Sequence, residues 1–103
     1  MNNYEGRRKN NEVLANGLPL NPAPSQKLRY HSPDGFNWGY AGSGPAQLAL
    51  AILLHHAGKE VALFLYQSFK WEFVSRWEDN WRITGAEIDE WTQKQFDHAE
   101  KGD

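Results

Sequence analysis

A glycine-rich turn, Gly42-Ser43-Gly44, directly precedes an apolar run that begins near Pro45. This order indicates that an extended chain bends sharply into a helix. The first amides of a helix have no partner inside it and can hold a phosphate or a carboxylate. The candidate ligand-binding residues of this turn, called the elbow below, are Gly42, Ser43, Gly44, Ala46 and Gln47. The competing interpretation is that the glycines only allow the turn and cap the helix.

Polar side chains upstream of the elbow could complete such an anion site. A segment of alternating aromatic and polar residues places Arg29, His31 and Asn37 on one face of a predicted hairpin, and Tyr40 next to the elbow. Arg29 could hold a phosphate through two parallel hydrogen bonds. The alternative is that this face of the hairpin is simply solvated. No lysine follows the glycines, so the elbow is not a P-loop.

The residue types of a hydrolytic triad are present, but the sequence does not bring them together. Ser43, His31 and Asp34 would be its members, and nothing positions the serine near the other two. His55 and His56 point about 100° apart on a helix and cannot chelate one metal ion well. The chain has no cysteine, which excludes thiolate sites and disulfides. We therefore expect a non-catalytic protein without a metal or other cofactor.

Composition limits the classes of protein that this chain can belong to. Its 103 residues, with five Trp, five Phe and four Tyr, suffice for one domain with one core. The formal net charge is −2 and no basic stripe is present, which argues against a nucleic-acid partner. The longest apolar run, residues 48–54, is too short to span a bilayer. We expect a cytoplasmic protein with a single domain over 1–103 and a frayed tail over 98–103.

Two hairpins are predicted in the first half of the chain. Residues 4–8 are a weak strand candidate, and Asn16-Gly17 between the apolar residues of 12–20 is a strong signal for a two-residue hairpin turn. Pro22 and Pro24 indicate a loop. Residues 28–40 alternate with a period of two around the turn Ser32-Pro33-Asp34-Gly35, which predicts the second hairpin.

Three helices are predicted in the second half. The first, over about 45–57, is apolar on nearly all sides and should therefore lie at the centre of the fold. The second runs from Glu60 to about Trp77, and a short extended piece over 81–83 follows it. Thr84 and Glu87 form a capping box that opens the third helix. The sequence therefore predicts an α+β fold, in which a small antiparallel β-meander of two hairpins packs with three α-helices.

A different class of function is a protein–protein inhibitor or adaptor. Tyr66 and Trp71 lie off the main apolar stripe of the second helix and could form an exposed contact patch. Because the central helix is apolar on all faces, three helices and a small sheet need not cover every apolar side chain. We expect a homo-oligomer for this reason.

The segment GFNWGYAGSGPAQLAL, residues 35–50, is specific enough to carry a resemblance. With the Asn-Gly hairpin and the segment 81–91, it resembles a small uncharacterised family of bacteria, archaea, plasmids and phages, a domain of unknown function. The resemblance implies a phage or mobile-element setting and brings no activity with it. The resulting hypothesis is a binding protein that holds an anionic, nucleotide-like ligand at the elbow and sequesters an immune signal of the host, as an anti-defence protein. The partner is then either this small ligand or, for the adaptor hypothesis, a host protein.

Overall fold

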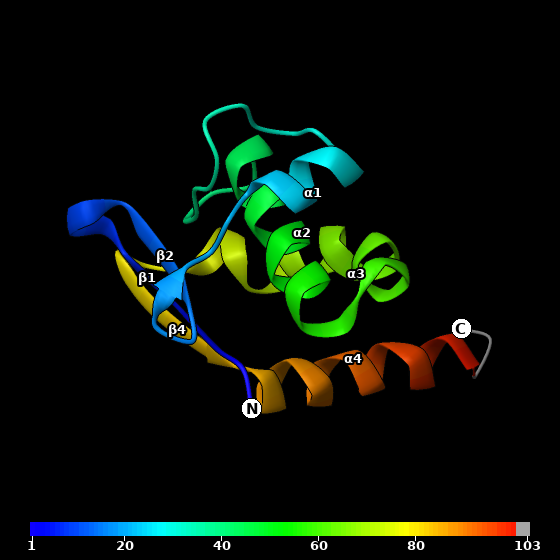
Figure 1. The fold of residues 1–103 in the computed structure, drawn as a ribbon. Helices are drawn as coiled ribbons and strands as arrows, with labels where there is room; N and C mark the ends of the chain where they lie inside the picture. The colour runs from blue at the N-terminus through cyan, green and yellow to red at the C-terminus, as the bar shows by residue number, and fades with distance from the viewer. Residues whose placement is uncertain (101–103) are drawn as a thin grey trace.

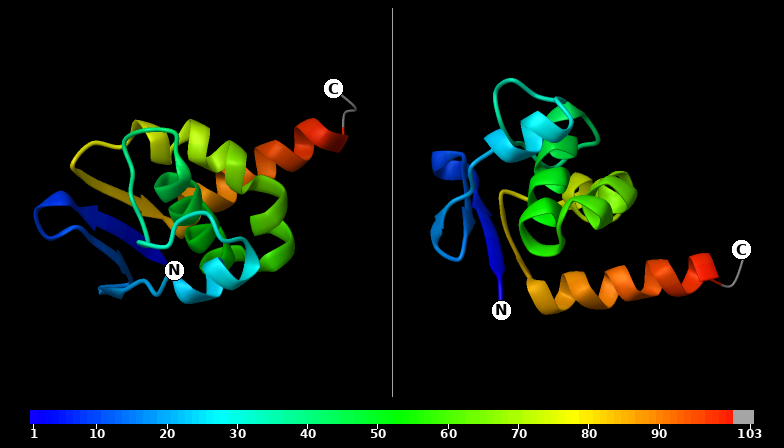
Figure 2. Two further views of the ribbon diagram at one scale, coloured as in Figure 1. Left: turned by 90° about the horizontal axis from the view of Figure 1, so that it is seen from above. Right: turned by 45° about the vertical axis from the view of Figure 1, so that its right-hand side comes forward.

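A four-stranded antiparallel sheet carries all the helices on one of its faces (Figure 1). The structure, a computed structural model, describes residues 1–100. Two further views show the same two layers, with the strands on one side and the helices on the other (Figure 2). The α+β class predicted from the sequence is confirmed.

The N-terminal strand lies inside the sheet, although it is the first element of the chain. The strands are β1 (Asn3–Arg7), β2 (Glu12–Ala15), β3 (Leu18–Pro19) and β4 (Asn80–Thr84), in the order β3-β2-β1-β4. Tyr4 of β1 is opposite Ala15 on one side and Ile83 on the other. Asn16 and Gly17, with φ of 55° and 81°, make the predicted turn between β2 and β3. The first predicted hairpin and the extended piece at 81–83 are therefore confirmed.

The central helix of the structure is α2 (Ser43–Ala57), and every residue from Gly44 to Leu53 is buried. This confirms the predicted apolar helix, which begins two residues earlier than expected. Gly58, with φ of 91°, reverses the chain into α3 (Lys59–Glu72). The predicted second helix is too long, because α3 ends at Glu72 and a short 3₁₀ turn, η2 (Val74–Arg76), replaces its last turn.

The capping box at the start of α4 (Gly85–Glu100) is formed as predicted. The Glu87 carboxylate accepts hydrogen bonds from the amide and the hydroxyl of Thr84, and the Glu87 amide donates to the Thr84 hydroxyl, each at 3.1 Å. Ile88 and Trp91 are buried, and the C-terminal half of α4 extends beyond the rest of the molecule (Figure 1). The tail predicted to fray over 98–103 is helical as far as Glu100, and its last three residues lie outside the described part.

The prediction of a second hairpin over 28–40 is wrong. Its first residue ends a short helix, α1 (Ala23–Leu28), and residues 29–42 contain no strand. The predicted loop at Pro22 and Pro24 is also wrong. Both prolines lie at the start of α1, because the first turn of a helix tolerates proline. Gly35 and Gly39 have φ of 94° and 88°, which interrupts an extended chain. The place of this hairpin in the sheet is taken by β4.

The core is continuous from the sheet to the helices and is rich in aromatic side chains. Trp77 and Trp81 stack with their rings 3.9 Å apart, and Trp38 meets Trp81 edge-on. The indole of Trp81 lies directly on Gly6 of β1, where an added Cβ would be 2.2 Å from its Nε1 atom. Glycine is required at this position for the indole to reach the strand.

Candidate functional site

Gln47 joins the segment after α1 to the second turn of α2. Its side chain is fully buried. The Oε1 atom accepts hydrogen bonds from the amides of His31 at 2.8 Å and Ser32 at 3.0 Å. The Nε2 atom donates to the Ser25 hydroxyl at 2.9 Å and to the Arg29 carbonyl at 3.1 Å. Because these four bonds occupy the Gln47 amide, its role is to hold Arg29 and His31 against α2, and it is not free to bind a ligand.

The rest of the elbow is partly covered by the segment that leads into it. A Cβ added at Gly44 would lie 2.7 Å from Cβ of Asn37 and 3.3 Å from the hydroxyl of Tyr40. The Asn37 Oδ1 atom already accepts hydrogen bonds from Arg8 and from the amide of Trp38. The predicted approach of Asn37 and Tyr40 to the elbow is therefore present in the structure, but the Oδ1 atom of Asn37 is engaged elsewhere.

The number of free amides at the elbow is smaller than expected. Ala46 is buried, and its amide donates to the carbonyl of Gly42 at 3.0 Å. The regular helical pattern pairs the Gln47 amide with the carbonyl of Ser43. The amides of Ser43 and Gly44 remain, together with the exposed side chain of Ser43. The glycines thus allow the turn and the close packing of Asn37. Only the amides of Ser43 and Gly44 and the Ser43 side chain remain to hold an anion at the elbow.

His31 is influenced by two further basic side chains, Arg29 and Lys70. The Nε2 atom of His31 lies 2.9 Å from the hydroxyl of Tyr66 on α3. Burial, followed by the nearby positive charges of Lys70 and Arg29, lowers the pKa of His31 below its ordinary value. Since both cations act on one imidazole, we name Arg29, His31 and Lys70 the basic cluster. Sequence reasoning missed Lys70, because no local pattern relates a residue of α3 to the loop after α1.

The side chains of the hypothetical triad are not joined. Within residues 1–100, His31 forms its side-chain hydrogen bond with Tyr66, and no hydrogen bond links it to Ser43 or Asp34. The same part of the chain contains no group of three or more His, Asp or Glu side chains placed to hold a metal ion. It also contains no helix with the length and apolar character needed to cross a membrane.

The predicted aromatic patch is divided between the core and the surface. Tyr66 is buried beneath His31, whereas Trp71 is 59% exposed and the ammonium of Lys70 lies 4.9 Å from the centre of its ring. Phe64, one heptad before Trp71 on α3, is 63% exposed and stacks on Phe96 of α4. The exposed aromatic face of α3 thus consists of Phe64 and Trp71, with Tyr66 excluded.

A model of a protein family of unknown function, DUF6166, matches residues 4–94. The chain belongs to this family. The match includes the sheet, the elbow and most of α4, so the DUF6166 domain spans almost all of the described fold. No curated protein and no solved structure matched the chain in the two other comparisons.

Proposed function

We propose that the protein is a non-catalytic binding protein that holds a small, anionic, nucleotide-like ligand at the basic cluster, beside the elbow. The observation that carries the proposal is that His31 is fixed by Gln47 and Tyr66, with Arg29 and Lys70 near enough for their positive charges to lower its pKa. Cations brought close together repel one another, and a bound anion relieves this repulsion. A phosphate is a suitable partner, because Arg29 offers a planar pair of donors and Lys70 a compact charge.

The surroundings supply groups for the remainder of a nucleotide. The Ser43 side chain and the first two amides of α2 are candidate phosphate donors at the positive end of the helix. The rings of Tyr30 and Tyr40 are exposed and offer flat surfaces for a base. Binding without chemistry would suffice to sequester a nucleotide signal of the host, which is the role that a phage or plasmid setting suggests.

Titration calorimetry of the protein with ADP, ADP-ribose, a cyclic dinucleotide and inorganic phosphate tests the proposal. We expect at least one nucleotide to bind, and Arg29→Gln and Lys70→Gln each to weaken it about tenfold, because a hydrogen bond to a charged group contributes about 1.5 to 3 kcal/mol. Ser43→Ala tests the elbow without disturbing its packing. Gly44→Val does not, because its Cβ would overlap Asn37.

Arg82→Gln is the matched control, because Arg82 is an exposed cation on β4. Its loss changes the net charge by the same amount and should leave affinity unchanged. Equal weakening by Arg82→Gln and Lys70→Gln would mean that only general charge attraction is being measured. Failure of all four probes to bind would refute the proposal.

The second candidate function is an inhibitor or adaptor that acts through the exposed aromatic face of α3. Two large aromatic side chains, Phe64 and Trp71, are exposed seven residues apart on one helix. Aromatic residues are enriched where proteins bind one another. Light scattering separates self-association from binding of a different protein. If the predicted homo-oligomer uses this face, Trp71→Glu gives a monomer, whereas Lys94→Glu on exposed α4 does not.

A further inference from the structure

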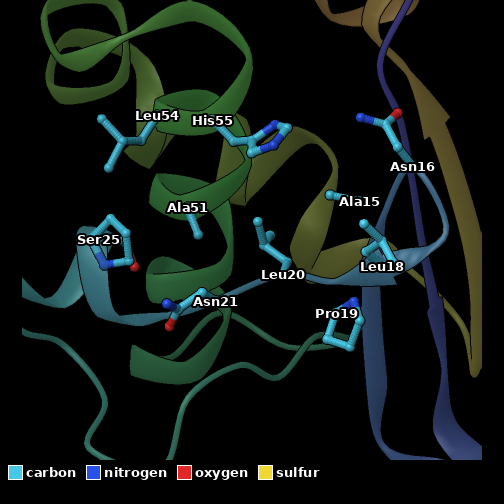
Figure 3. A pocket seen from close by; sticks show the side chains of 11 residues that line it. Ala15, Asn16, Leu18, Pro19, Leu20, Asn21, Ser25, Ala51, Leu54 and His55 are labelled. Atoms are coloured by element: carbon cyan, nitrogen blue, oxygen red, sulfur yellow. The ribbon is translucent and has the colours of Figure 1, made fainter.

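A pocket of about 370 Å³ opens between the β2–β3 hairpin and α2, and none of the proposed anion-binding groups lines it (Figure 3). One wall is formed by the hairpin and the chain that leaves it, and the opposite wall by α1 and the C-terminal half of α2. The lining residues include Leu18, Leu20, Ala51, Leu54 and His55. The pocket belongs to a part of the molecule that the elbow and the basic cluster do not use.

The walls of the pocket are mostly apolar, with four polar residues among them, Asn16, Asn21, Ser25 and His55. Leucine, alanine and proline side chains provide most of the surface, and no Lys, Arg, Asp or Glu is among the lining residues. Leu18, at the edge of the sheet, is 70% exposed. Pockets of this size and character suit a small molecule that buries an apolar body and makes one or a few directed hydrogen bonds.

His55 is the ionisable side chain that lines the pocket, and its ring projects from α2 opposite Asn16 (Figure 3). Its Nδ1 atom lies 2.7 Å from the hydroxyl of Tyr4, which is fully buried. Burial raises the pKa of Tyr4 to about 12, so this hydroxyl keeps its proton at neutral pH. We assign that proton to the bond with Nδ1, which leaves the imidazole proton on Nε2. Tyr4 thereby makes His55 a hydrogen-bond donor at Nε2, an atom with no protein partner among residues 1–100.

The partial negative charge at the C-terminal end of α2 disfavours an anion at His55. His55 lies in the last turn of α2, where the unpaired carbonyls give the helix end a partial negative charge. A carboxylate would meet this field without a lysine or arginine in the lining to offset it. A neutral carbonyl oxygen accepts the Nε2 proton without that penalty.

We propose that this pocket binds a small neutral molecule with an apolar body and one carbonyl group, and that the carbonyl accepts the hydrogen bond of His55 Nε2. The apolar body lies between Leu18 and Leu20 on one side and Ala51 and Leu54 on the other. This is a second binding site, opposite in chemistry to the basic cluster, and its existence does not depend on the proposed anion site.

Three matched probes test the chemistry: 4-phenyl-2-butanone, with a neutral carbonyl, butylbenzene, with no acceptor, and 3-phenylpropionate, with a carboxylate. Binding is followed by NMR chemical-shift titration of the ¹⁵N-labelled protein. We expect the ketone to bind about tenfold more tightly than the hydrocarbon and the carboxylate to bind most weakly. The shifts should centre on the hairpin and the C-terminal half of α2. Tighter binding of the carboxylate than of the ketone would overturn the proposed ligand class.

Two variants test the residues. Leu18→Glu places a charge on the pocket wall at an exposed position and should weaken the ketone about tenfold, whereas Ser68→Glu, at an exposed position of α3, should leave it unchanged. His55→Phe keeps an aromatic ring but removes the donor, and should abolish the preference for the ketone over butylbenzene. The proposal is overturned if the ketone shifts no hairpin resonance at millimolar concentration, or if Leu18→Glu has no effect. ADP affinity should be the same for Leu18→Glu and the parent protein, so failure here and failure of the anion site are distinguishable.

Discussion

The hydroxyl of Tyr4 on β1 lies 2.7 Å from Nδ1 of His55 on α2, and the two rings meet edge-on with their centres 5.5 Å apart. The bond joins an inner strand of the sheet to the central helix, through two residues that lie 51 positions apart in the sequence. The phenol is completely buried, so its ionisation is strongly disfavoured in the folded state. The stability of the fold is thereby linked to the protonation of one tyrosine.

Alkaline titration should reveal this link. Since Tyr4 has a pKa of about 12 in the folded protein and about 10 when unfolded, the folded state binds the proton more tightly. The free energy of unfolding should therefore decrease as pH rises from 10 to 12, by an amount on the order of 2 to 3 kcal/mol. Urea unfolding at several pH values measures this slope. Tyr4→Phe should lower the stability at neutral pH by about 1 kcal/mol and flatten the alkaline decrease, and an equally steep decrease in Tyr4→Phe would contradict the assignment.

At acidic pH we expect the stability of the fold to depend on the protonation of His31. Its pKa is lowered in the folded protein by burial and by the charges of Lys70 and Arg29, so the unfolded state takes up the proton first as pH falls. Stability should be complete above the ordinary histidine pKa of 6.5 and decrease as pH falls below it. Thermal unfolding between pH 7.5 and 5 checks this. His31→Gln should show a shallower decrease, because this variant lacks the imidazole whose pKa is lowered by folding.

Anion binding should raise the pKa of His31, whereas folding alone lowers it. If ADP occupies the basic cluster, its phosphates stabilise the imidazolium of His31, so binding takes up a proton and becomes tighter as pH falls from 7.5 to 6. Calorimetry in two buffers of different ionisation enthalpy counts the protons taken up. In His31→Gln this proton uptake should vanish, and uptake that persists in the variant would assign the linkage to another group.

Removal of Gln47 should loosen the segment that follows α1. Gln47→Leu fills a similar volume but leaves the amides of His31 and Ser32 without their acceptor. Buried unpaired groups of this kind cost about 1 to 3 kcal/mol each, so we expect a loss of about 2 to 5 kcal/mol. Hydrogen exchange should show the change at His31 and Ser32. The exposed neighbour Ser43→Ala provides the control and should change stability by less than about 0.5 kcal/mol.

The contact between Gly6 and Trp81 can be tested by a paired substitution. Gly6→Ala places a methyl group 2.2 Å from the Nε1 atom of the indole, so the sheet and the tryptophan cannot keep their positions. Overpacking of this kind costs about 1 to 3 kcal/mol. Trp81→Phe removes the contacting atoms, and the double variant should recover part of the loss relative to the sum of the two single changes. Strict additivity in urea unfolding would show that the two positions are independent.

The sequence correctly predicted the parts of the fold that depend on interactions between neighbouring residues. The turn at Asn16-Gly17 and the capping box at Thr84 depend on a few neighbouring residues, and both are present. The apolar run of α2 is long enough to predict a buried helix from composition alone. The wrong hairpin over 28–40 has a different origin. Period-two alternation also occurs in an irregular extended segment, and here the buried Gln47 side chain, not a neighbouring strand, accepts from the amides of His31 and Ser32.

The candidate site was predicted only in part for the same reason. Backbone atoms of Arg29 and His31 are bonded to Gln47 of the elbow, but the predicted hairpin that should have presented their side chains there is absent. Lys70 joins them from α3 only because α2 and α3 pack side by side, and no pattern within α3 marks it. The pocket beside His55 was missed entirely, since its walls come from four separate elements and consist of ordinary apolar residues.

The position of β1 between β2 and β4 has a consequence for the order of assembly during synthesis. The partner on one side, β2, emerges within a few residues, but the partner on the other side begins only at Asn80. Until that strand has left the ribosome, the nascent chain presents an unpaired strand edge, of the kind that templates aggregation. The short, proline-ended β3 blunts the opposite edge permanently. The interval before β4 is made is thus the period in which this edge of β1 is open to pairing with another chain.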